Sequence, residues 1–186
     1  YLAYTLNETG GIAFDIRILD MSTGETLPER IPASPWGLTW ADTERLVYTA
    51  QDDALRSSAA MLHQLGTEVD SDLLLYREDD EVFSLNVYSS SDRAYLFLLS
   101  GSMDTAEVRH VPLASPDEGL TLFAPRRQGV IYSLEHWNGE FLVLTNEGAR
   151  DFQVLAVPVD PARREQMRTV IPPQDGRLLQ QVSLFR

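Results

Sequence analysis

Cysteine is absent from the 186 residues, so the chain has neither a disulfide framework nor a thiolate metal site. Apolar stretches are short, and none reaches the length of about 18 residues that a transmembrane helix needs. No basic, apolar and small-residue leader opens the sequence, so we expect no membrane-spanning segment. Residue 1 is tyrosine rather than methionine, and we therefore expect a fragment of a longer protein.

Signatures of several enzyme classes are absent as well. The sequence has no Gly-x-Ser-x-Gly elbow for a serine nucleophile and no glycine-rich phosphate loop. His63, His110 and His136 stand in three separate predicted strands, without His-x-His or His-Glu-x-x-His spacing. We therefore predict no catalytic residue, no metal site and no cofactor in this chain.

Basic residues are scarce: 15 stand against 28 acidic ones, which gives a net charge of −13. Such a surface repels phosphate backbones and disfavours nucleic acid as a partner, whereas it would attract cationic peptides. Solubility alone also explains the charge, and composition favours that simpler interpretation. The hydrophobic content of 44% and the length suit one globular domain with a sizeable core.

What the sequence does contain is a repeated β-meander, clearest between Val130 and Asp160. Three short apolar runs lie there, and the first turn is Asn138-Gly139, which supplies the two positive-φ residues of a tight hairpin. Asn146-Glu147-Gly148 separates the second run from the third, and a fourth run follows a polar loop. Pro161 after Asp160 predicts a helical turn capped by Asp160. We expect a four-stranded antiparallel sheet of about 45 residues, the length of one propeller blade.

The same meander recurs upstream with a nearly constant period. Equivalent second-strand leucines are residues 2, 46, 96 and 142, and equivalent third-strand residues are 16, 61, 108 and 154. Both series repeat every 44 to 50 residues, as a propeller repeat requires. The predicted fold class is all-β, a partial β-propeller of about four four-stranded antiparallel blades, the first without its inner strand. The blades span approximately 1–34, 35–80, 81–128 and 129–174, and residues 175–186 supply the inner strand of a fifth.

The outer strands carry features that discourage pairing with other chains. Prolines lie at or near the ends of three of them, where proline removes a ladder donor; these are Pro32, Pro125, Pro172 and Pro173. The second blade ends instead in the acidic run 78–81. Its Asp79 and Asp80 are candidates for steering basic peptides toward the propeller, although a solvated loop is the simpler interpretation.

Two further residue pairs are candidates for contacts with a substrate or with another domain. Glu107 and Arg109 stand two apart on one predicted strand and therefore share a face, where we favour a structural ion pair between blades over a ligand contact. Glu135 and His136 lie beside the Asn-Gly hairpin, and there we favour a structural role at the end of a strand.

Five collinear segments carry a family resemblance: 62–78 (LHQLGTEVDSDLLLYRE), 105–111 (TAEVRHV), 123–137 (FAPRRQGVIYSLEHW), 145–155 (TNEGARDFQVL) and 170–185 (VIPPQDGRLLQQVSLF). Together they resemble the N-terminal propeller of the prolyl oligopeptidase family of serine peptidases, and the resemblance runs through almost the whole chain. Leu65-Gly66-Thr67 is typical of the family at large. The stretch 132–136 is similar to the oligopeptidase B branch in particular.

That resemblance implies a two-domain hydrolase, in which a seven-bladed propeller restricts access to a C-terminal α/β-hydrolase domain with a Ser-Asp-His triad. It implies cleavage of short peptides after Arg or Lys, and a cytoplasmic location with a periplasmic one as the alternative. The chain would be an inactive gating segment whose partners are that domain and short basic peptides, with no nucleic acid and no membrane. The alternative is a non-enzymatic propeller scaffold or peptide-binding module, against which the lack of Trp-Asp and Gly-His repeat signatures argues.

Three departures from the family pattern concern specificity and the contacts with the catalytic domain. Gly10-Gly11-Ile12-Ala13 replaces a usually basic hairpin, Arg56 and the residues after it replace the usual Pro-Tyr-Gln-Val, and Ile131 replaces a common Glu. An incomplete ring also has unpaired flanks. We therefore expect 178–185 either to supply the missing inner strand of the first blade or to pair with another copy of the chain.

Overall fold

The computed structural model describes residues 1–8, 10–11 and 13–184, so that Ile12 of the first departure lies outside the described residues. Within this part of the chain there are 15 strands and two short 3₁₀ helices. The strands are β1 (Leu2–Leu6), β2 (Phe14–Leu19), β3 (Ile31–Ala33), β4 (Leu38–Trp40), β5 (Arg45–Gln51), β6 (Ser57–Gln64), β7 (Leu73–Arg77), β8 (Ser84–Ser89), β9 (Tyr95–Gly101), β10 (Ala106–Pro112), β11 (Thr121–Ala124), β12 (Tyr132–Trp137), β13 (Glu140–Thr145), β14 (Gln153–Pro158) and β15 (Arg168–Ile171). The helices are η1 (Val69–Ser71) and η2 (Pro161–Gln166).

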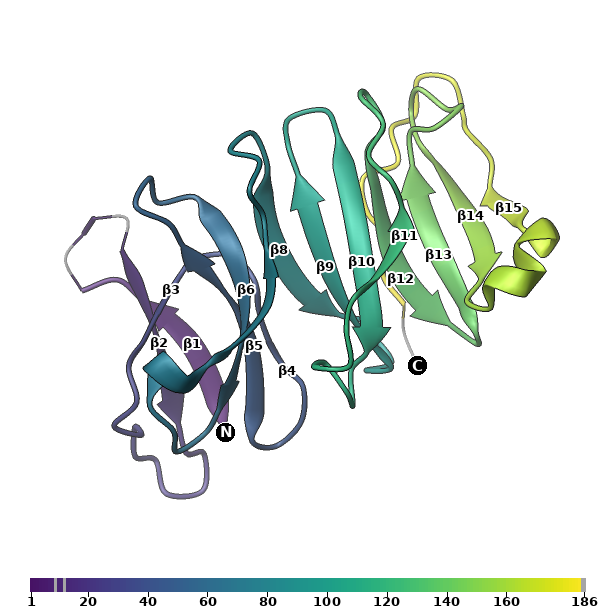
Figure 1. Ribbon diagram of the computed structural model, residues 1–186. Coiled ribbons are helices and arrows are strands. Elements are labelled where there is room, and N and C mark those ends of the chain that lie inside the picture. Colours follow the sequence, from purple (N-terminus) through teal and green to yellow (C-terminus); the bar gives the residue numbers. More distant parts are fainter. Residues whose placement is uncertain (9, 12, 185–186) are drawn as a thin grey trace.

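The strands form four antiparallel meanders, which confirms the predicted fold class. One sheet contains β1–β3, and the other three contain β4–β7, β8–β11 and β12–β15, each with its strands in chain order. We call them the first to the fourth blade. They stand side by side in an open row, with the first and the fourth at opposite ends (Figure 1).

Local sequence explains the tightest turns of the fourth blade. Asn138 (φ 50°) and Gly139 (φ 78°) form the predicted two-residue hairpin between β12 and β13. The predicted helical turn is η2, where the side chain of Asp160 accepts a 2.9 Å hydrogen bond from the amide of Ala162. Pro161 occupies its first turn, where a missing amide proton costs nothing.

Three apolar seams hold neighbouring blades together, because the middle strands bury side chains on both faces. In β5, Leu46 and Tyr48 pack against the first blade, whereas the intervening Val47 packs against the third. The seam between the third and fourth blades is rich in aromatic rings, with Phe97 and Phe141 in T-shaped contact at 5.7 Å between centroids. Both faces of these strands are therefore core, as the continuous apolar runs predict.

The outer strands of the three four-stranded blades share an irregularity that the sequence did not reveal. Each has one extra residue, a β-bulge, where it pairs with the third strand. The extra residues are Leu75 in β7, Phe123 in β11 and Val170 in β15. A bulge twists the free edge away from flat pairing, so it protects the circumference together with the prolines and the acidic run.

The two ends of the blades differ in the segments that form them. One end, which we call the connector face, carries the links from each outer strand to the next inner strand, 34–37, 78–83 and 125–131, and the hairpin tips 52–56, 102–105 and 146–152. The other end, the opposite face, carries the turns that follow the inner and third strands, among them the β2–β3 loop and the β12–β13 hairpin (Figure 1). Every inner strand therefore begins at the connector face, and every outer strand ends there.

The last described segment of the chain, which we expected to be an inner strand, has another conformation in the structure. Residues 178–184 form no ladder, and residue 185 lies outside the described part of the chain. The amide of Leu179 donates a 3.0 Å hydrogen bond to the carbonyl of Asp151, and residues 180–183 line a pocket with β12 and β13. The segment thus covers the flank of the fourth blade. It does not close the ring, because the first blade lies at the far end of the row (Figure 1).

Candidate functional site

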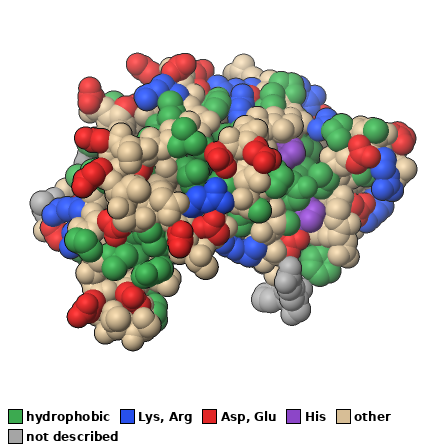
Figure 2. Space-filling view, turned by 60° about the horizontal axis from the view of Figure 1, so that its bottom comes forward, with side chains coloured by type: hydrophobic (Ala, Val, Ile, Leu, Met, Phe, Trp, Pro, Cys, Tyr) green, Lys and Arg blue, Asp and Glu red, His purple; other side chains and the backbone are tan. Residues whose placement is uncertain are grey.

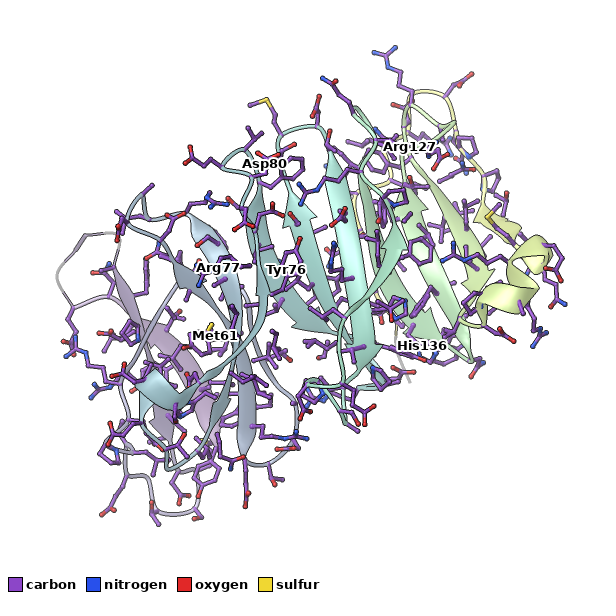
Figure 3. All side chains as sticks on the ribbon, viewed as in Figure 1. Met61, Tyr76, Arg77, Asp80, Arg127 and His136 are labelled. Carbon is purple, nitrogen blue, oxygen red and sulfur yellow. The ribbon has the colours of Figure 1, made fainter. Side chains whose placement is uncertain are left out.

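The six candidate residues do not converge on one site. Asp79 and Asp80 lie in the 78–83 link on the connector face, and Glu135 and His136 lie at the other end of the fourth blade. Figure 3 shows Asp80 and His136 at opposite faces of the molecule. Glu107 and Arg109 belong to the first half of β10, below the connector face.

The acidic link 78–83 is held from below by Arg56, which directly precedes β6. Its guanidinium donates hydrogen bonds of 3.1 Å to the carbonyl of Glu78, 3.1 Å to that of Asp80 and 2.8 Å to that of Phe83. Asp52 fixes the guanidinium in turn, with 3.0 Å between its Oδ2 and Arg56 Nε. Arg56, a departure from the family pattern, thus fixes the backbone of the link, whose Asp79 and Asp80 side chains are exposed.

Glu78 differs from its acidic neighbours, because its side chain is buried and reaches the third blade. Its carboxylate accepts a 2.6 Å hydrogen bond from the hydroxyl of Ser100 and forms an ion pair with Arg126. Burial alone would raise the pKa of Glu78, but the hydrogen bonds from Ser100 and Arg126 outweigh it and hold that pKa below its ordinary value. The residue is therefore a buried anion that joins two blades.

Glu107 and Arg109 form an ion pair with each other, within β10 rather than between blades. Arg109 itself also reaches the second blade, since its guanidinium lies 4.5 Å from the centre of the Tyr76 ring. Arg126, in the link after β11, places its Nε 3.6 Å from Glu107 Oε2. Arg126 also stacks 3.8 Å over the ring of Phe83. The two candidates are part of a charged network that seals the seam between the second and third blades.

A pocket of about 340 Å³ opens beside this network on the connector face. The 78–83 link and the β9–β10 hairpin form its walls, and its lining is Asp80, Val82, Phe83, Ser102, Asp104, Thr105, Arg126 and Gln128. Both Asp80 and Arg126 border it, with 3.9 Å between Asp80 Oδ2 and Arg126 Nη1. The lining of the pocket thus contains the guanidinium of Arg126, the carboxylates of Asp80 and Asp104, and apolar side chains.

Glu135 and His136 tie the fourth blade to the third at the opposite face. His136 Nδ1 lies 2.7 Å from Asp92 Oδ2, and the carboxylate of Glu135 accepts hydrogen bonds from the amide (2.9 Å) and hydroxyl (2.7 Å) of Ser91. Burial would raise the pKa of Asp92, but hydrogen bonds from Ser90, the amide of Ala94 and His136 lower it. Both candidates are engaged in structural contacts at a strand end.

A second buried His–Asp pair was not found from the sequence. His63 Nδ1 lies 2.7 Å from Asp72 Oδ1, and Asp72 Oδ2 accepts a 2.8 Å hydrogen bond from the hydroxyl of Tyr48. The side chains of His63 and Asp72 are 0% exposed, so this imidazole cannot meet a dissolved substrate. The arrangement is suited to fixing the η1 loop on the sheet, not to general acid–base catalysis.

Charge is spread over the surface rather than gathered in one place. Figure 2 turns the opposite face forward and shows acidic side chains on all parts of it, interspersed with basic and apolar ones. Within the described residues, no group of three or more His, Asp or Glu side chains is placed to hold a metal ion. No helix in the same residues is both long and apolar enough to cross a membrane.

Comparison with known families and structures gives a consistent result. The pattern of the prolyl oligopeptidase N-terminal beta-propeller domain matches residues 1–186. The chain is 35% identical to Protease 2 of Moraxella lacunata, over all of this chain and 27% of that protein. It is 29% identical to dipeptidyl aminopeptidase BI of Pseudoxanthomonas mexicana, over 99% of this chain and 26% of that protein.

The fold is also that of solved structures. Oligopeptidase B from Leishmania major superposes with a TM-score of 0.82 and 25% identity, over 92% of this chain and 24% of that one. The chain therefore spans about a quarter of the length of the relatives it matches.

Proposed function

Because the chain belongs to the prolyl oligopeptidase family, as part of its N-terminal β-propeller domain, we propose that it is a substrate-gating segment of an oligopeptidase B-like serine endopeptidase. The parent enzyme would hydrolyse short peptides after Arg or Lys, using a Ser-Asp-His triad in a C-terminal α/β-hydrolase domain. This chain would contribute no catalytic residue. We place the protein in the cytoplasm on the same family grounds.

The observation that carries the proposal is the end-to-end match to a propeller domain. The buried His–Asp and Glu–Arg pairs of this chain have structural roles. His63 and Glu78 are buried, and His136 is engaged with Asp92. A wall of packed blades is suited to excluding large molecules, because interiors packed at this density admit no folded protein. Gating is thus a role that such a chain can fill without chemistry of its own.

Chain topology indicates where the catalytic domain would dock. Every inner strand begins and every outer strand ends at the connector face. A chain that enters a propeller by an inner strand and leaves by an outer strand therefore crosses that face twice. We place the catalytic domain there, over the 78–83 link.

Charge supports the choice of basic peptides as substrates. The connector face carries the exposed carboxylates of Asp79, Asp80 and Glu81, and the whole chain has a net charge of −13. A surface of one sign raises the local concentration of ligands of the other sign and speeds their arrival. Peptides that contain Arg or Lys would gain from it.

The decisive experiment is an assay of the full-length protein on matched chromogenic peptides that end in Arg, Lys, Leu or Pro. We expect hydrolysis after Arg and Lys, abolished by a serine-reactive inhibitor. Turnover of the Pro or Leu peptide in their place would disprove the proposed specificity, and no turnover at all would favour the scaffold alternative. Release of dipeptides from a longer peptide would instead place the protein with activities of the kind named for the Pseudoxanthomonas relative.

A second assay tests gating by size. One Arg-containing sequence is offered as a free peptide and as an exposed loop of a stable folded protein. We expect cleavage of the free peptide alone, and equal cleavage of both would contradict a gate.

A further inference from the structure

The two most exposed large hydrophobic side chains of the described residues stand on two segments that line one pocket. Met103 is 98% exposed and Val82 is 72% exposed. Val82 belongs to the 78–83 link, and Met103 belongs to the tip of the β9–β10 hairpin, so the two segments form opposite walls of the 340 Å³ pocket on the connector face. Exposed apolar side chains grouped at a pocket are typical of interaction surfaces.

These side chains stand on rigid segments. The three carbonyl contacts of Arg56 fix the link, and the carboxylate of Asp80 accepts a 3.1 Å hydrogen bond from the amide of Val82. The hairpin tip is closed by a 2.9 Å hydrogen bond from the amide of Ser102 to the carbonyl of Thr105. A surface fixed before binding loses little conformational entropy on association, so it is suited to specific docking.

Carboxylates surround the two apolar side chains. Asp79, Asp80, Glu81 and Asp104 are exposed on the same two segments. The nearest cation, Arg126, is already engaged by Glu78. A partner surface that buries Val82 and Met103 must therefore present basic groups around an apolar centre, because an acidic one would be repelled.

We infer that Val82, Met103 and the carboxylates of Asp80 and Asp104 form a docking surface for the catalytic domain of the full-length protein, which meets it with an apolar patch bordered by Arg or Lys. The inference rests on the proposed function and names the residues through which the gate is held shut. The occupant follows from the topology, since the chain that leads to any domain beyond the propeller leaves from this same face. The relatives are about four times longer than this chain, and a polypeptide of that length has room for a domain-sized partner.

Methionine oxidation in the full-length protein tests the inference, with Met21 as an internal control. Met21 is 66% exposed and lies in the β2–β3 loop of the opposite face. Without docking, Met103 would be oxidised by hydrogen peroxide at least as fast as Met21. We expect Met103 to be oxidised about tenfold more slowly than Met21, because an interface core is shielded from solvent.

Three results would overturn the inference: Met103 oxidised as fast as Met21, protection that disappears on dilution, or protection that requires an added basic peptide. The second result would indicate a contact between copies, and the third a contact with substrate. Each can arise whether or not the protein hydrolyses Arg and Lys peptides, so the outcome is separable from that of the proposed function.

Substitution of the two apolar residues tests the docking surface independently of oxidation. In the full-length protein we expect V82E/M103E to raise cleavage of the Arg sequence in the folded test protein about tenfold, while hydrolysis of the short peptide stays unchanged, because the gate opens more often. The matched variant M21E should change neither rate. Unaltered exclusion of the folded substrate by V82E/M103E would count against the docking surface.

Discussion

The carboxylate of Asp72 lies 2.7 Å from the imidazole of His63, and neither side chain has exposed surface. The pair joins the η1 loop to the third strand of the second blade, and Tyr48 of the second strand donates to the same carboxylate. Burial and the neighbouring Asp72 both raise the pKa of Tyr48, so its hydroxyl stays a donor throughout the ordinary pH range.

We predict that Asp72→Asn lowers the free energy of unfolding by about 3 kcal/mol, because it removes the buried carboxylate that contacts both the His63 imidazole and the Tyr48 hydroxyl. Asp70→Asn is the control, since Asp70 is exposed in the same loop and should change stability by less than about 0.5 kcal/mol. Native-state hydrogen exchange of β6 in the full-length protein measures both. Equal effects of the two variants would show that the pair is not a stabilising contact.

Glu78 should make the propeller sensitive to acid. Its pKa is held below the ordinary value of about 4.3, so its contribution to stability is complete above that pH and is lost as the pH falls through the lower, folded pKa. We expect Glu78→Gln to be less stable than wild type at pH 7 and to lose less additional stability on acidification. Thermal unfolding between pH 7 and pH 3 measures the slopes. Asp79→Asn, at an exposed neighbour, should keep the wild-type slope.

Gly37 and Gly139 should respond differently to alanine, although both have positive φ. At Gly139 (φ 78°) an added Cβ meets nothing within 4 Å, so we expect a loss of about 1 kcal/mol from backbone strain alone. At Gly37 (φ 83°) the same atom would lie 2.7 Å from the backbone nitrogen of Val87 in the third blade. Gly37→Ala should therefore cost about 3 kcal/mol or more, because backbone must move. Denaturant unfolding of the two variants would refute this ranking if Gly139→Ala were the less stable.

Neutralising the acidic link should slow the capture of basic substrates. We expect Asp79→Asn and Glu81→Gln together to lower kcat/KM for an Arg peptide about threefold at low salt, with kcat unchanged, because steering acts on arrival rather than on chemistry. The difference should disappear at high salt, where exposed charges are screened.

The control for this variant removes the same charge from the opposite face. Glu68 and Asp70 are exposed there, on the β6–β7 loop, and their double amide variant should leave kcat/KM within error of wild type. If both double variants lose activity equally, net charge rather than the position of the link is responsible.

The strands and blades could be predicted because their causes are local. The Asn138-Gly139 turn fixes one hairpin, and apolar residues on both faces of β13 require two covering blades. The bulge at Phe123 could not be predicted in the same way, since it depends on how β11 pairs with β10. The segment 178–184 forms no ladder within the chain, contrary to the expected ring closure, because an apolar pattern does not reveal whether a partner strand is within reach. Pairing of this segment with another copy of the chain stays a prediction.

The polar contacts between blades were harder to predict, although the partners of two of them are separated in sequence by about one blade period. Glu78 and Arg126 are 48 residues apart, and Asp92 and His136 are 44 apart, each close to one blade period. Residues separated by one repeat occupy equivalent positions in neighbouring blades, so a charge and its complement at that spacing can meet across a seam. The clamp formed by Arg56 does not obey this rule, because its acceptors are backbone carbonyls, which no side-chain pattern reveals.

The side-by-side row of blades has a consequence for cooperativity. Contacts between strands of different blades in the described residues join each blade to the next one along the chain, as in β3 with β5, β6 with β8 and β10 with β12. The free energy of such an array is close to a sum of terms for single blades and for adjacent pairs, as in a one-dimensional lattice. A defect in one blade should therefore loosen its immediate neighbours and leave more distant blades protected from exchange. The strength of the contacts between adjacent blades therefore determines how many blades lose stability when one of them is destabilised.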